Sequence, residues 1–479
     1  MKQELFIGND TKTIYRAYKK TVSIVQESAI SMFEGIAKGK KSFLLESYDK
    51  NYDRYSFFGV EPKAIITSCK EGLKIADRDG TIQIMQGNPM QCLKVLYSSI
   101  EVKKDPGELN MIGGFVGSIG YDYVRFMEEI PDQNPDEIGI ETIQLMFVTE
   151  FITIDHMAET LTAVVLSADN SAGRIKGELR ANELVEEVFG AQKERMRDFV
   201  RDGKILGKTD SIEAYSKKVE KIKEFIKEGH VFQTVLSQRW TIQTNQTGLQ
   251  LYRELRERNP SPYLYYFQFE TFEIIGSSPE MLVKLQDQKV FTCPIAGTRK
   301  RGKTPEEDQQ LKEELLEDEK ERAEHVMLVD LARNDMGRIA EFGTVKVTEF
   351  MKVQNYSHVM HLVSLVEGKK REEYHPVDLI SAFLPAGTLS GAPKIRAMEI
   401  IDELEEVKRG LYGGATGYLG FNGNMDFCIT IRTMIKKADR VYLQAGAGIV
   451  ADSVGEKEYE ECCNKVMALA KTLVLEESL

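Results

Sequence analysis

Short apolar runs separated by glycines and polar turns dominate the first 200 positions of the chain. The runs at 42–47, 64–67 and 145–148 have the length and residue types of β-strands. The glycine-dense segment 113–121 favours a strand bend or a close approach of the backbone. Helical periodicity is scarce here, so we expect this part of the chain to be mostly sheet.

The pattern changes after a polar, charged segment at 171–200, which predicts a helix that leads to an exposed joint at 202–204. Residues 212–228 then carry apolar side chains at helical spacing, which predicts an amphipathic helix. Further helices are predicted at 248–258, 306–333 and 456–474. Strands are predicted at 231–242, 263–269, 274–276, 414–421, 428–434 and 441–445. The fold class is therefore α+β, with large antiparallel sheets packed in a sandwich and helices on the outside.

The chain of 479 residues is too long for one ordinary core and fits two domains or one large two-lobed fold. We place the boundary at the predicted joint. This gives an N-terminal region at 1–203 and a second, larger domain at 204–479.

Composition excludes several classes of function. The 63 Lys and Arg against 75 Asp and Glu give a net charge of −12 without a basic patch, so a nucleic-acid partner is not expected. No apolar run approaches the length of a membrane span, and the start lacks a secretory apolar core. The six cysteines form no Cys-x-x-Cys pair, and none lies in a nucleophile elbow. We expect a cytoplasmic protein with reduced thiols, no membrane partner and no glutaminase nucleophile of its own.

Two glutamate pairs carry the first candidate chemistry. Glu321 and Glu324 are three residues apart on one predicted helix, as are Glu458 and Glu461 on another. Each pair presents two carboxylates on one helix face, and two facing pairs would offer four oxygen donors to Mg²⁺. Lys465 lies one turn beyond Glu461, where it can hold an anionic substrate.

The competing interpretation is a solvated helix face with weak ion pairs. The apolar stretch 326–332 directly follows Glu324, which favours a position near a buried edge for the first pair. That stretch makes the metal interpretation stronger without excluding the alternative.

Several longer phrases add a resemblance. They are Pro-Ile-Ala-Gly-Thr-Arg at 294–299, Ala-Glu-His at 323–325 with Asp-Leu-Ala-Arg-Asn-Asp at 330–335, Ser-His-Val-Met-His at 357–361, Pro-Ala-Gly-Thr-Leu-Ser-Gly-Ala-Pro-Lys at 385–394, and the stretch 458–465. In this order they resemble the chorismate-utilising enzyme family, and within it the members that aminate chorismate. The likeness is strong over roughly 205–470 and weaker before it.

The resemblance implies chorismate as substrate and Mg²⁺ as cofactor. Glu324 and Glu461 would bind the metal directly, with Glu321 and Glu458 in support. The metal would hold the ring carboxylate and withdraw electron density from the ring.

The resemblance also implies a substrate-binding set. Arg432 would clamp the enolpyruvyl carboxylate together with Tyr412, although a buried structural ion pair is the alternative for this arginine. Glycine backbone groups would approach the substrate closely. The remaining substrate-binding residues are Gly297, Thr298, Gly446, Gly448 and Lys465.

The implied catalytic residues are Glu280, His361, Gln233 and Thr388. Glu280 would protonate the departing ring hydroxyl, which requires burial to raise its pKa. His361 would orient that hydroxyl or assist proton movement, and Thr388 would donate a hydrogen bond to substrate. Gln233 occupies the place where relatives that add water have a lysine base, which points to amination instead.

The reaction implied is amination of chorismate followed by loss of pyruvate to give anthranilate, the first step of tryptophan biosynthesis. A separate glutamine amidotransferase subunit would supply the ammonia. Two alternatives stay open. One is 4-amino-4-deoxychorismate synthesis, which would keep the enolpyruvyl group, and the other is a tryptophan-binding regulatory protein on the same scaffold.

The segments 44–47 and 259–263 resemble the two halves of a tryptophan feedback site in this family. Glu46 would accept from the amino group of the inhibitor. The alternative is a strand that merely ends in a turn. The effector set consists of Leu45, Glu46, Ser47, Arg54, Pro262, Tyr263 and Leu264.

Overall fold

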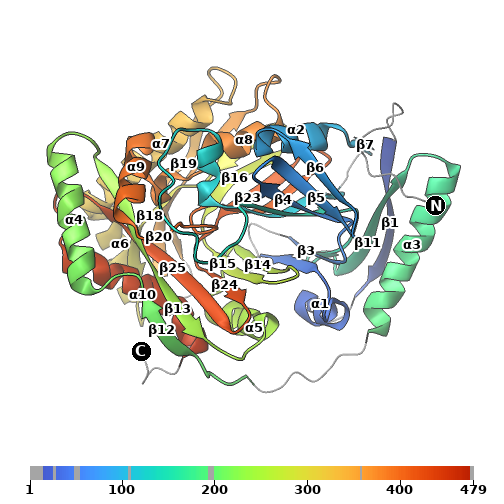
Figure 1. Cartoon of the computed structure of the whole chain (residues 1–479), viewed down its shortest axis with the longest axis horizontal. Helices are drawn as coiled ribbons and strands as arrows, with labels where there is room; N and C mark the ends of the chain where they lie inside the picture. The colour runs from blue at the N-terminus through green and yellow to red at the C-terminus, as the bar shows by residue number, and fades with distance from the viewer. Residues whose placement is uncertain are drawn as a thin grey trace.

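Two large β-sheets stacked against each other form the centre of the molecule (Figure 1). The computed structural model describes residues 14–24, 28–47, 54–105, 109–191, 199–355 and 359–474. Nearly all strand neighbours are antiparallel, β1 with β7 being a parallel pair. The α+β sandwich predicted from the sequence is confirmed.

The first sheet contains the strands that lead into the site. In spatial order it comprises β12 (Lys204–Lys208), β13 (Gln233–Gln243), β25 (Arg440–Ile449), β24 (Thr433–Lys437), β15 (Glu273–Ser278), β14 (Tyr263–Gln268), β2 (Ser42–Glu46), β3 (Tyr55–Val60), β10 (Glu150–Asp155), β11 (Thr160–Ala168), β1 (Ile14–Ser23) and β7 (Glu101–Lys103), with β21 (Gly391–Ala392) beside β13.

The second sheet covers the inner face of the first. In spatial order it comprises β18 (Ile295–Lys300), β20 (Val359–Lys369), β17 (Lys289–Thr292), β16 (Met281–Gln286), β23 (Met425–Ile429), β22 (Ala415–Gly420), β8 (Gly114–Ile119), β9 (Ile143–Val148), β4 (Ala64–Cys69), β5 (Gly72–Asp77) and β6 (Ile82–Gln86), with β19 (Lys346–Asn355) beside β20.

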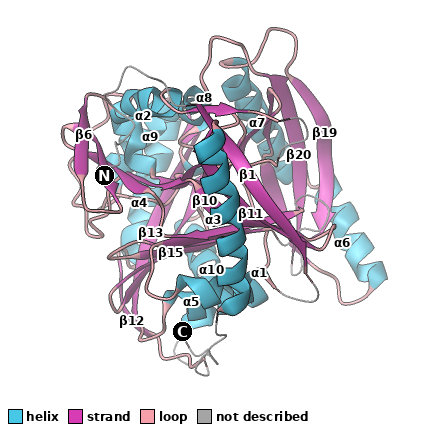
Figure 2. Ribbon diagram, turned by 90° about the vertical axis from the view of Figure 1, so that its right-hand side faces the viewer, coloured by secondary structure: helices cyan, strands magenta, loops and turns pink. Residues whose placement is uncertain are grey.

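Helices pack on the outer faces of the sheets. Figure 2 shows α3 lying along β1 and β11, which it contacts over much of its length. The helices are α1 (Ala29–Ala37), α2 (Pro89–Ser98), α3 (Ser171–Gly190), α4 (Ile212–Lys227), α5 (Gly248–Arg258), α6 (Pro305–Glu317), α7 (Glu319–Gly337), α8 (Pro376–Phe383), α9 (Lys394–Leu404) and α10 (Gly455–Leu473), with short 3₁₀ turns η1 (Tyr121–Phe126) and η2 (Gly387–Leu389).

The middle strands of the first sheet are buried on both faces. Phe57 belongs to the apolar core between the two sheets, whereas its neighbour Phe58 belongs to the core beneath the outer helices. Phe43 and Leu44 are divided in the same way. Because successive strand residues point to opposite faces, a strand buried on both sides reads as a continuous apolar run.

Three predicted elements need correction. The helix expected at 306–333 is two helices, because Asp318 ends α6 and caps α7 by accepting from the Lys320 and Glu321 N–H groups. The strand expected at 428–434 is interrupted between β23 and β24, so Arg432 lies on the connection. The helix expected at 171–200 ends at Gly190, and 192–198 lie outside the described residues.

The predicted joint at 202–204 is tied to the rest of the molecule. Asp202 accepts hydrogen bonds from Thr244 and from the Asn245 N–H, and the Gly203 N–H donates to Leu473 O at 2.9 Å. Both sheets combine strands from either side of position 203, for example β2 beside β14. The joint is therefore a fixed segment that leads into β12, and it is not an exposed linker.

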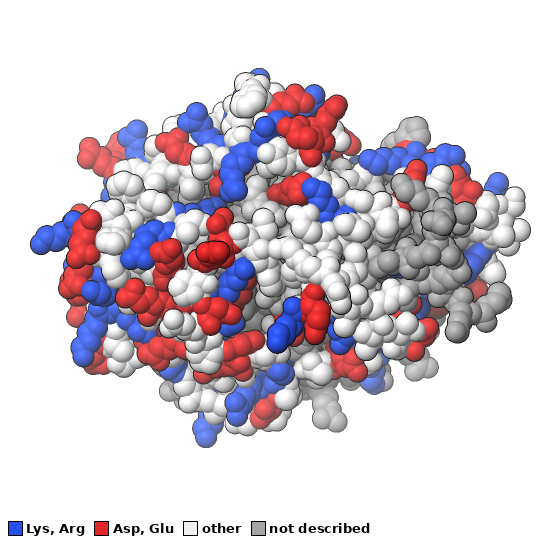
Figure 3. Space-filling view, turned by 45° about the horizontal axis from the view of Figure 1, so that its top comes forward, with Lys and Arg blue, Asp and Glu red and all other residues white. Residues whose placement is uncertain are grey.

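Acidic and basic side chains are interspersed over the face drawn in Figure 3. On this face the charges are distributed and do not gather into one patch of a single sign. Within the described part of the chain, none of the helices combines the length and the apolar character needed to cross a bilayer.

Candidate active site

Glu280 and Thr388 form the centre of the candidate site. Glu280 lies between β15 and β16, where the chain passes from the first sheet to the second, and Thr388 lies on η2. Thr388 Oγ1 donates to Glu280 Oε1 at 3.2 Å. Burial raises the pKa of Glu280 to about 8, against the opposing effects of this hydrogen bond and of Lys465. The buried carboxyl therefore holds its proton at neutral pH, as a general acid requires.

A cavity of about 40 Å³ adjoins this carboxyl group. Its wall is mainly apolar and comes from α7, the end of α8 and η2. Asp335 also lines it, and its carboxylate is paired with Lys394 Nζ at 3.0 Å. Glu280 and Thr388 therefore border a small cavity, and their burial makes the hydrogen bond between them stronger than it would be in water.

His361 on β20 is held by the neighbouring strand β18. Its Nδ1 lies 2.8 Å from Gly297 O and 3.1 Å from Thr298 Oγ1. Because the carbonyl can only accept, Nδ1 carries the proton and Nε2 carries the lone pair. Burial lowers the pKa of His361, and the charge of Arg432 lowers it further, so the imidazole is neutral at pH 7.

Gly297 allows β18 to approach the first glutamate pair. Its φ of +61° is a left-handed conformation that side chains disfavour. A Cβ at this position would also lie 3.2 Å from Glu321 Oε2. The glycine thus brings the strand that holds His361 next to the carboxylate of Glu321.

Arg432 has an unusual backbone. Its φ of +51° is left-handed although it is not a glycine, and its carbonyl accepts from the Ser277 N–H at 3.1 Å. Its Nη1 donates to Lys465 O at 3.2 Å, and burial lowers its pKa. No carboxylate partner of Arg432 occurs among the described residues, which argues against the structural ion pair considered as an alternative. Strain of this kind is typical of functional positions.

Lys465 joins α10 to β25. Its Nζ contacts Glu461 at 2.6 Å and donates to Gly446 O at 2.9 Å. The predicted neighbours on one helix face therefore meet, and they face the glycine strand that the sequence assigned to substrate.

Tyr412 and Gln233 complete the site around this strand. A Cβ at Gly446 would lie 3.0 Å from the Tyr412 hydroxyl, and one at Gly448 would collide with Gln233 Nε2. Both side chains are buried, and burial raises the pKa of Tyr412. A side chain at 448 would therefore require the Gln233 amide to move.

The four glutamates come near one another without forming a ready metal site. Although water reaches Glu324, partial burial and the charges of Glu321 and Glu461 raise its pKa. Burial and the charge of Glu461 likewise raise that of Glu458. In the described ranges, however, no three His, Cys, Asp or Glu side chains are grouped closely enough to hold a metal ion.

The physical reason lies in the charges. Like charges repel, and Glu321 and Glu461 turn instead to Arg299 Nη1 and Lys465 Nζ. The sequence predicted that the four glutamates converge on one point. In the structure they lie close enough to raise one another's pKa, but their carboxylates do not form one group among the described residues. Carboxylate oxygens that destabilise one another's charge still fit a hard divalent cation.

The two halves of the predicted effector site lie side by side. Leu264 on β14 is paired with Glu46 on β2. The Glu46 carboxylate accepts from the Tyr252 hydroxyl at 2.7 Å and from Arg256 Nε at 3.0 Å. Glu46 is thus a buried, bonded carboxylate that points towards α5.

Other members of the effector set are placed differently. Ser47 Oγ is buried and lacks a hydrogen-bond partner in the described structure, and the Tyr263 hydroxyl donates to Asp426 at 2.9 Å. Arg54 is exposed and binds Asp155 through Nε at 2.6 Å, so it does not join Glu46. Pro262, Leu45 and Leu264 lie along β2 and β14, where Leu264 is buried and the other two are half-buried.

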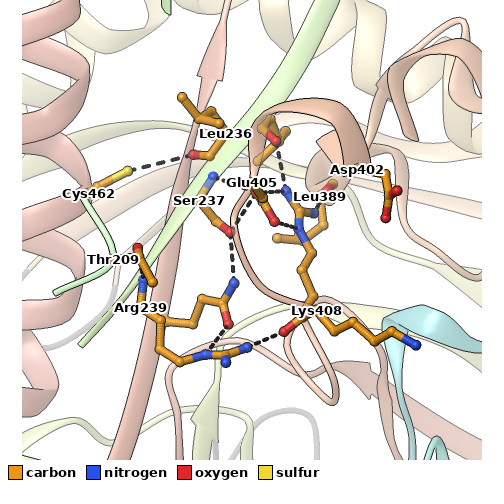
Figure 4. A network of polar contacts seen from close by, with 12 residues as sticks. Thr209, Leu236, Ser237, Arg239, Leu389, Asp402, Glu405, Lys408 and Cys462 are labelled. Atoms are coloured by element: carbon orange, nitrogen blue, oxygen red, sulfur yellow. Dashed lines mark hydrogen bonds and ion pairs between the residues drawn. The ribbon is translucent and has the colours of Figure 1, made fainter. Parts of the chain in front are cut away.

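Sequence reasoning missed a buried ion pair next to the site. Arg409 Nη2 contacts Glu405 Oε1 at 2.6 Å, and both side chains are almost fully enclosed (Figure 4). Their spacing of four residues resembles that of a helical ion pair, but both residues lie beyond the end of α9, and the sequence does not show that this pair is buried. Of the two histidines in the 357–361 phrase, His361 is described, whereas position 358 lies outside the described residues.

Known proteins with similar sequences identify the family of this chain. Anthranilate synthase component 1 of Acetivibrio thermocellus is 46% identical over 460 residues, covering 93% of each chain. The protein of the same name from Aquifex aeolicus is 42% identical over 473 residues, covering 94% of this chain and 93% of that protein. Relatives of this length and identity are chorismate-utilising enzymes by name, and this confirms the resemblance inferred from the short phrases.

Solved structures agree as well. Anthranilate synthase component I from Streptococcus pneumoniae has a TM-score of 0.78 at 38% identity, over 89% of this chain and 94% of that chain. The menaquinone-specific isochorismate synthase of Escherichia coli has a TM-score of 0.73 at 18% identity, over 96% and 95%, and its likeness concerns the fold alone. The family described as chorismate binding enzyme matches residues 40–471. The chain therefore belongs to the family of chorismate binding enzymes.

Proposed function

We propose that the chain converts chorismate and ammonia to anthranilate and pyruvate, the first step of tryptophan biosynthesis. The observation that carries the proposal is the buried Glu280 with a pKa of about 8, bonded to Thr388. A carboxyl group that keeps its proton at neutral pH can protonate a hydroxyl as it leaves. The names of the relatives support anthranilate as the product.

Each side chain of the site has its own role in the proposed reaction. Arg432 clamps the enolpyruvyl carboxylate through its planar guanidinium, and Lys465 adds a positive charge beside it. Ammonia forms the new C–N bond while the ring C–O bond breaks, and the hydroxyl leaves as water with the proton from Glu280. The neutral His361 orients that hydroxyl with its lone-pair nitrogen. Loss of a ring proton and of the enolpyruvyl group as pyruvate then gives the aromatic ring.

Gln233 distinguishes amination from hydration. An amide cannot take a proton from water at neutral pH, whereas free ammonia needs no such activation. The amide is buried against Gly448, close to where the ring would lie. We therefore infer that water bound here is not made nucleophilic.

Magnesium is part of the proposal. Glu324 and Glu461 would hold it, supported by Glu321 and Glu458, and the bound cation would polarise the ring carboxylate as a Lewis acid. The mutual repulsion that raises the pKa of Glu324 supports this assignment, because a divalent cation relieves it.

Two further parts of the proposal concern other molecules. A glutamine amidotransferase subunit supplies ammonia, since none of the cysteines was expected to act as a glutaminase nucleophile and the relatives are named as component 1. Tryptophan inhibits by binding beside the paired ends of β2 and β14, where the buried Ser47 hydroxyl has no hydrogen-bond partner in the described structure.

The test is a fluorescence assay of the purified chain with chorismate, Mg²⁺ and ammonium salt at alkaline pH. We expect anthranilate fluorescence that EDTA abolishes, that excess Mg²⁺ restores and that tryptophan suppresses. A chain that binds tryptophan but turns over no chorismate under any of these conditions would instead support the regulatory alternative.

A further inference from the structure

A fully buried guanidinium lies behind the candidate site. Arg409 is 2% exposed and donates to Leu389 O at 2.6 Å through Nη1 and to Val235 O at 2.8 Å through Nη2 (Figure 4). Its Nε and Nη2 also bond to the two carboxylate oxygens of Glu405, at 2.8 and 2.6 Å. One planar group therefore joins a 3₁₀ turn, a strand and a carboxylate at once.

Glu405 extends the network into the first sheet. Its Oε1 accepts from both the N–H and the hydroxyl of Ser237 on β13, at 2.9 and 2.7 Å. Gln444 on β25 donates to the same hydroxyl at 2.8 Å and accepts from Arg239 at 3.1 Å. Figure 4 shows these side chains pointing toward one another between the strands and the turn after α9.

Each segment held by this network carries a candidate substrate-site residue. Leu389 directly follows Thr388, and Val235 and Ser237 follow Gln233 on β13. Gln444 precedes the glycines of β25.

The segment around Tyr412 is held as well. The Arg409 guanidinium lies over the rings of Tyr121 and Tyr412, at 4.6 and 5.6 Å from their centroids. The Tyr412 N–H donates to Arg409 O at 3.2 Å. The turn η2, strand β13 and the segment of Tyr412 thus meet at one ion pair, and β25 is joined to it through Ser237.

We propose that Glu405 and Arg409 are positioning residues for the amination proposed above, and that they act chiefly by holding Leu389 so that Thr388 reaches Glu280. The inference rests on the proposed function. The Ser390 carbonyl accepts from the Val235 N–H at 2.9 Å, and β21 pairs with β13 beyond it, so Arg409 adds the link to β13 that lies next to Thr388 in the chain. Without it, the nearest link from this turn to β13 would be one residue further from Thr388, at Ser390.

Packing alone does not explain a charged pair at this place. An apolar pair of similar volume often gives equal or greater stability than a buried ion pair. What an apolar pair lacks is the ability to bond two carbonyls in fixed directions, which the guanidinium fork provides. Burial lowers the pKa of Arg409, but the charge and hydrogen bonds of Glu405 outweigh it and raise that pKa, so the fork stays protonated throughout the working range.

The test variant is Glu405→Gln/Arg409→Met. Glutamine keeps an acceptor for Ser237, and methionine fills the space without leaving a lone buried charge. The matched control is Glu150→Gln/Arg180→Met, which removes a 3.0 Å glutamate–arginine pair between β10 and α3, far along the sheet from η2. Both are compared with the unmodified protein for melting temperature, KM for chorismate, kcat and the pH dependence of kcat.

We expect the test variant to melt cooperatively with kcat reduced at least about tenfold. The alkaline limb of its pH profile should shift to higher pH, because the Thr388 hydrogen bond that lowers the pKa of Glu280 is lost. The control should keep kcat and profile within about twofold. A folded test variant that behaves like the control in both kcat and profile overturns the inference.

A second variant keeps the test decisive if the first does not fold. Arg409→Lys retains the charge beside Glu405 but cannot bond both carbonyls, so kcat should fall while the fold persists. Adding Thr388→Val to this variant should cost less than the same change in the unmodified protein, because both act on one contact. Full additivity of the two losses would contradict the inference, whereas absence of turnover in the unmodified protein would instead refute the proposed function.

Discussion

Thr388 donates a hydrogen bond to Glu280 across the boundary between η2 and the β15–β16 connection, with Oγ1 3.2 Å from Oε1. Burial pushes the pKa of Glu280 up to about 8, while this bond and Lys465 pull it down. The balance leaves a carboxylic acid that is protonated near neutral pH yet not so weak that it cannot give up its proton.

Thr388→Val should raise the pKa of Glu280 above about 8, because an interaction that favours the carboxylate is removed. The alkaline limb of kcat should shift to higher pH and the maximum should fall. The measurement is the pH profile of kcat at saturating chorismate and ammonia. Thr388→Ser retains the hydroxyl and serves as control, and an identical profile for serine and valine variants would show that the hydrogen bond plays no part.

Glu280→Gln should reduce kcat by about 10² to 10⁴-fold, the usual contribution of a positioned general acid. The KM for chorismate should change little, since this carboxyl acts on the leaving hydroxyl. Steady-state kinetics check both values. A large rise in KM with kcat preserved would assign Glu280 to binding.

The same variant should alter the pH dependence of stability. The pKa of Glu280 in the folded protein, about 8, lies above its ordinary value of 4.5, so the folded state retains a proton that the unfolded chain releases. Stability from this group is therefore complete below about pH 4.5 and is lost as pH rises to about 8. Urea unfolding at pH 5 and 8.5 should show Glu280→Gln gaining on the unmodified protein at the higher pH, and a constant difference would contradict the assigned pKa.

Ser47→Ala should weaken tryptophan inhibition without destabilising the free protein. The Ser47 hydroxyl is buried and unpartnered in the described structure, so its removal breaks no bond there. The inhibition constant and the melting temperature are the two readouts. Arg54→Ala is the control, because Arg54 is exposed and bound to Asp155, and it should leave inhibition unchanged. If only the Arg54 variant lost inhibition, the tryptophan site would have to be assigned to the region of Arg54 and not to Ser47.

Glu324→Gln should weaken Mg²⁺ binding, measured by calorimetry in the absence of substrate. Burial and the charges of Glu321 and Glu461 raise the pKa of this carboxyl group, and a bound cation would relieve that repulsion. Glu319→Gln, in the first turn of the same helix, is the control. Equal affinities for both variants would remove Glu324 from the metal site.

Local signals were enough to predict many elements. The helix at 248–258 is confirmed at both ends, and its start has a local signal because Thr247 and Gln250 form a capping box. The break at Asp318 also has a local signal, since aspartate is a favoured N-cap residue, but the acidic run around it resembled one continuous polar helix.

The long-range contacts could not be predicted from the sequence alone. Glu46 is bonded to Tyr252 and Arg256 on a helix about two hundred positions away, so a residue assigned to a ligand also has a structural role. The left-handed backbone of Arg432 interrupts a stretch whose composition is that of a strand. Both features depend on tertiary packing, which overrides local propensity.

The most direct test of the account is product analysis with ¹⁵N-ammonium. The purified chain is incubated with chorismate, Mg²⁺ and labelled ammonium, and the products are separated by chromatography and identified by mass spectrometry. For the proposed amination we expect ¹⁵N-anthranilate and pyruvate in equal amounts. An aminated product that retains its enolpyruvyl group, or a hydroxylated product without ¹⁵N, would contradict it.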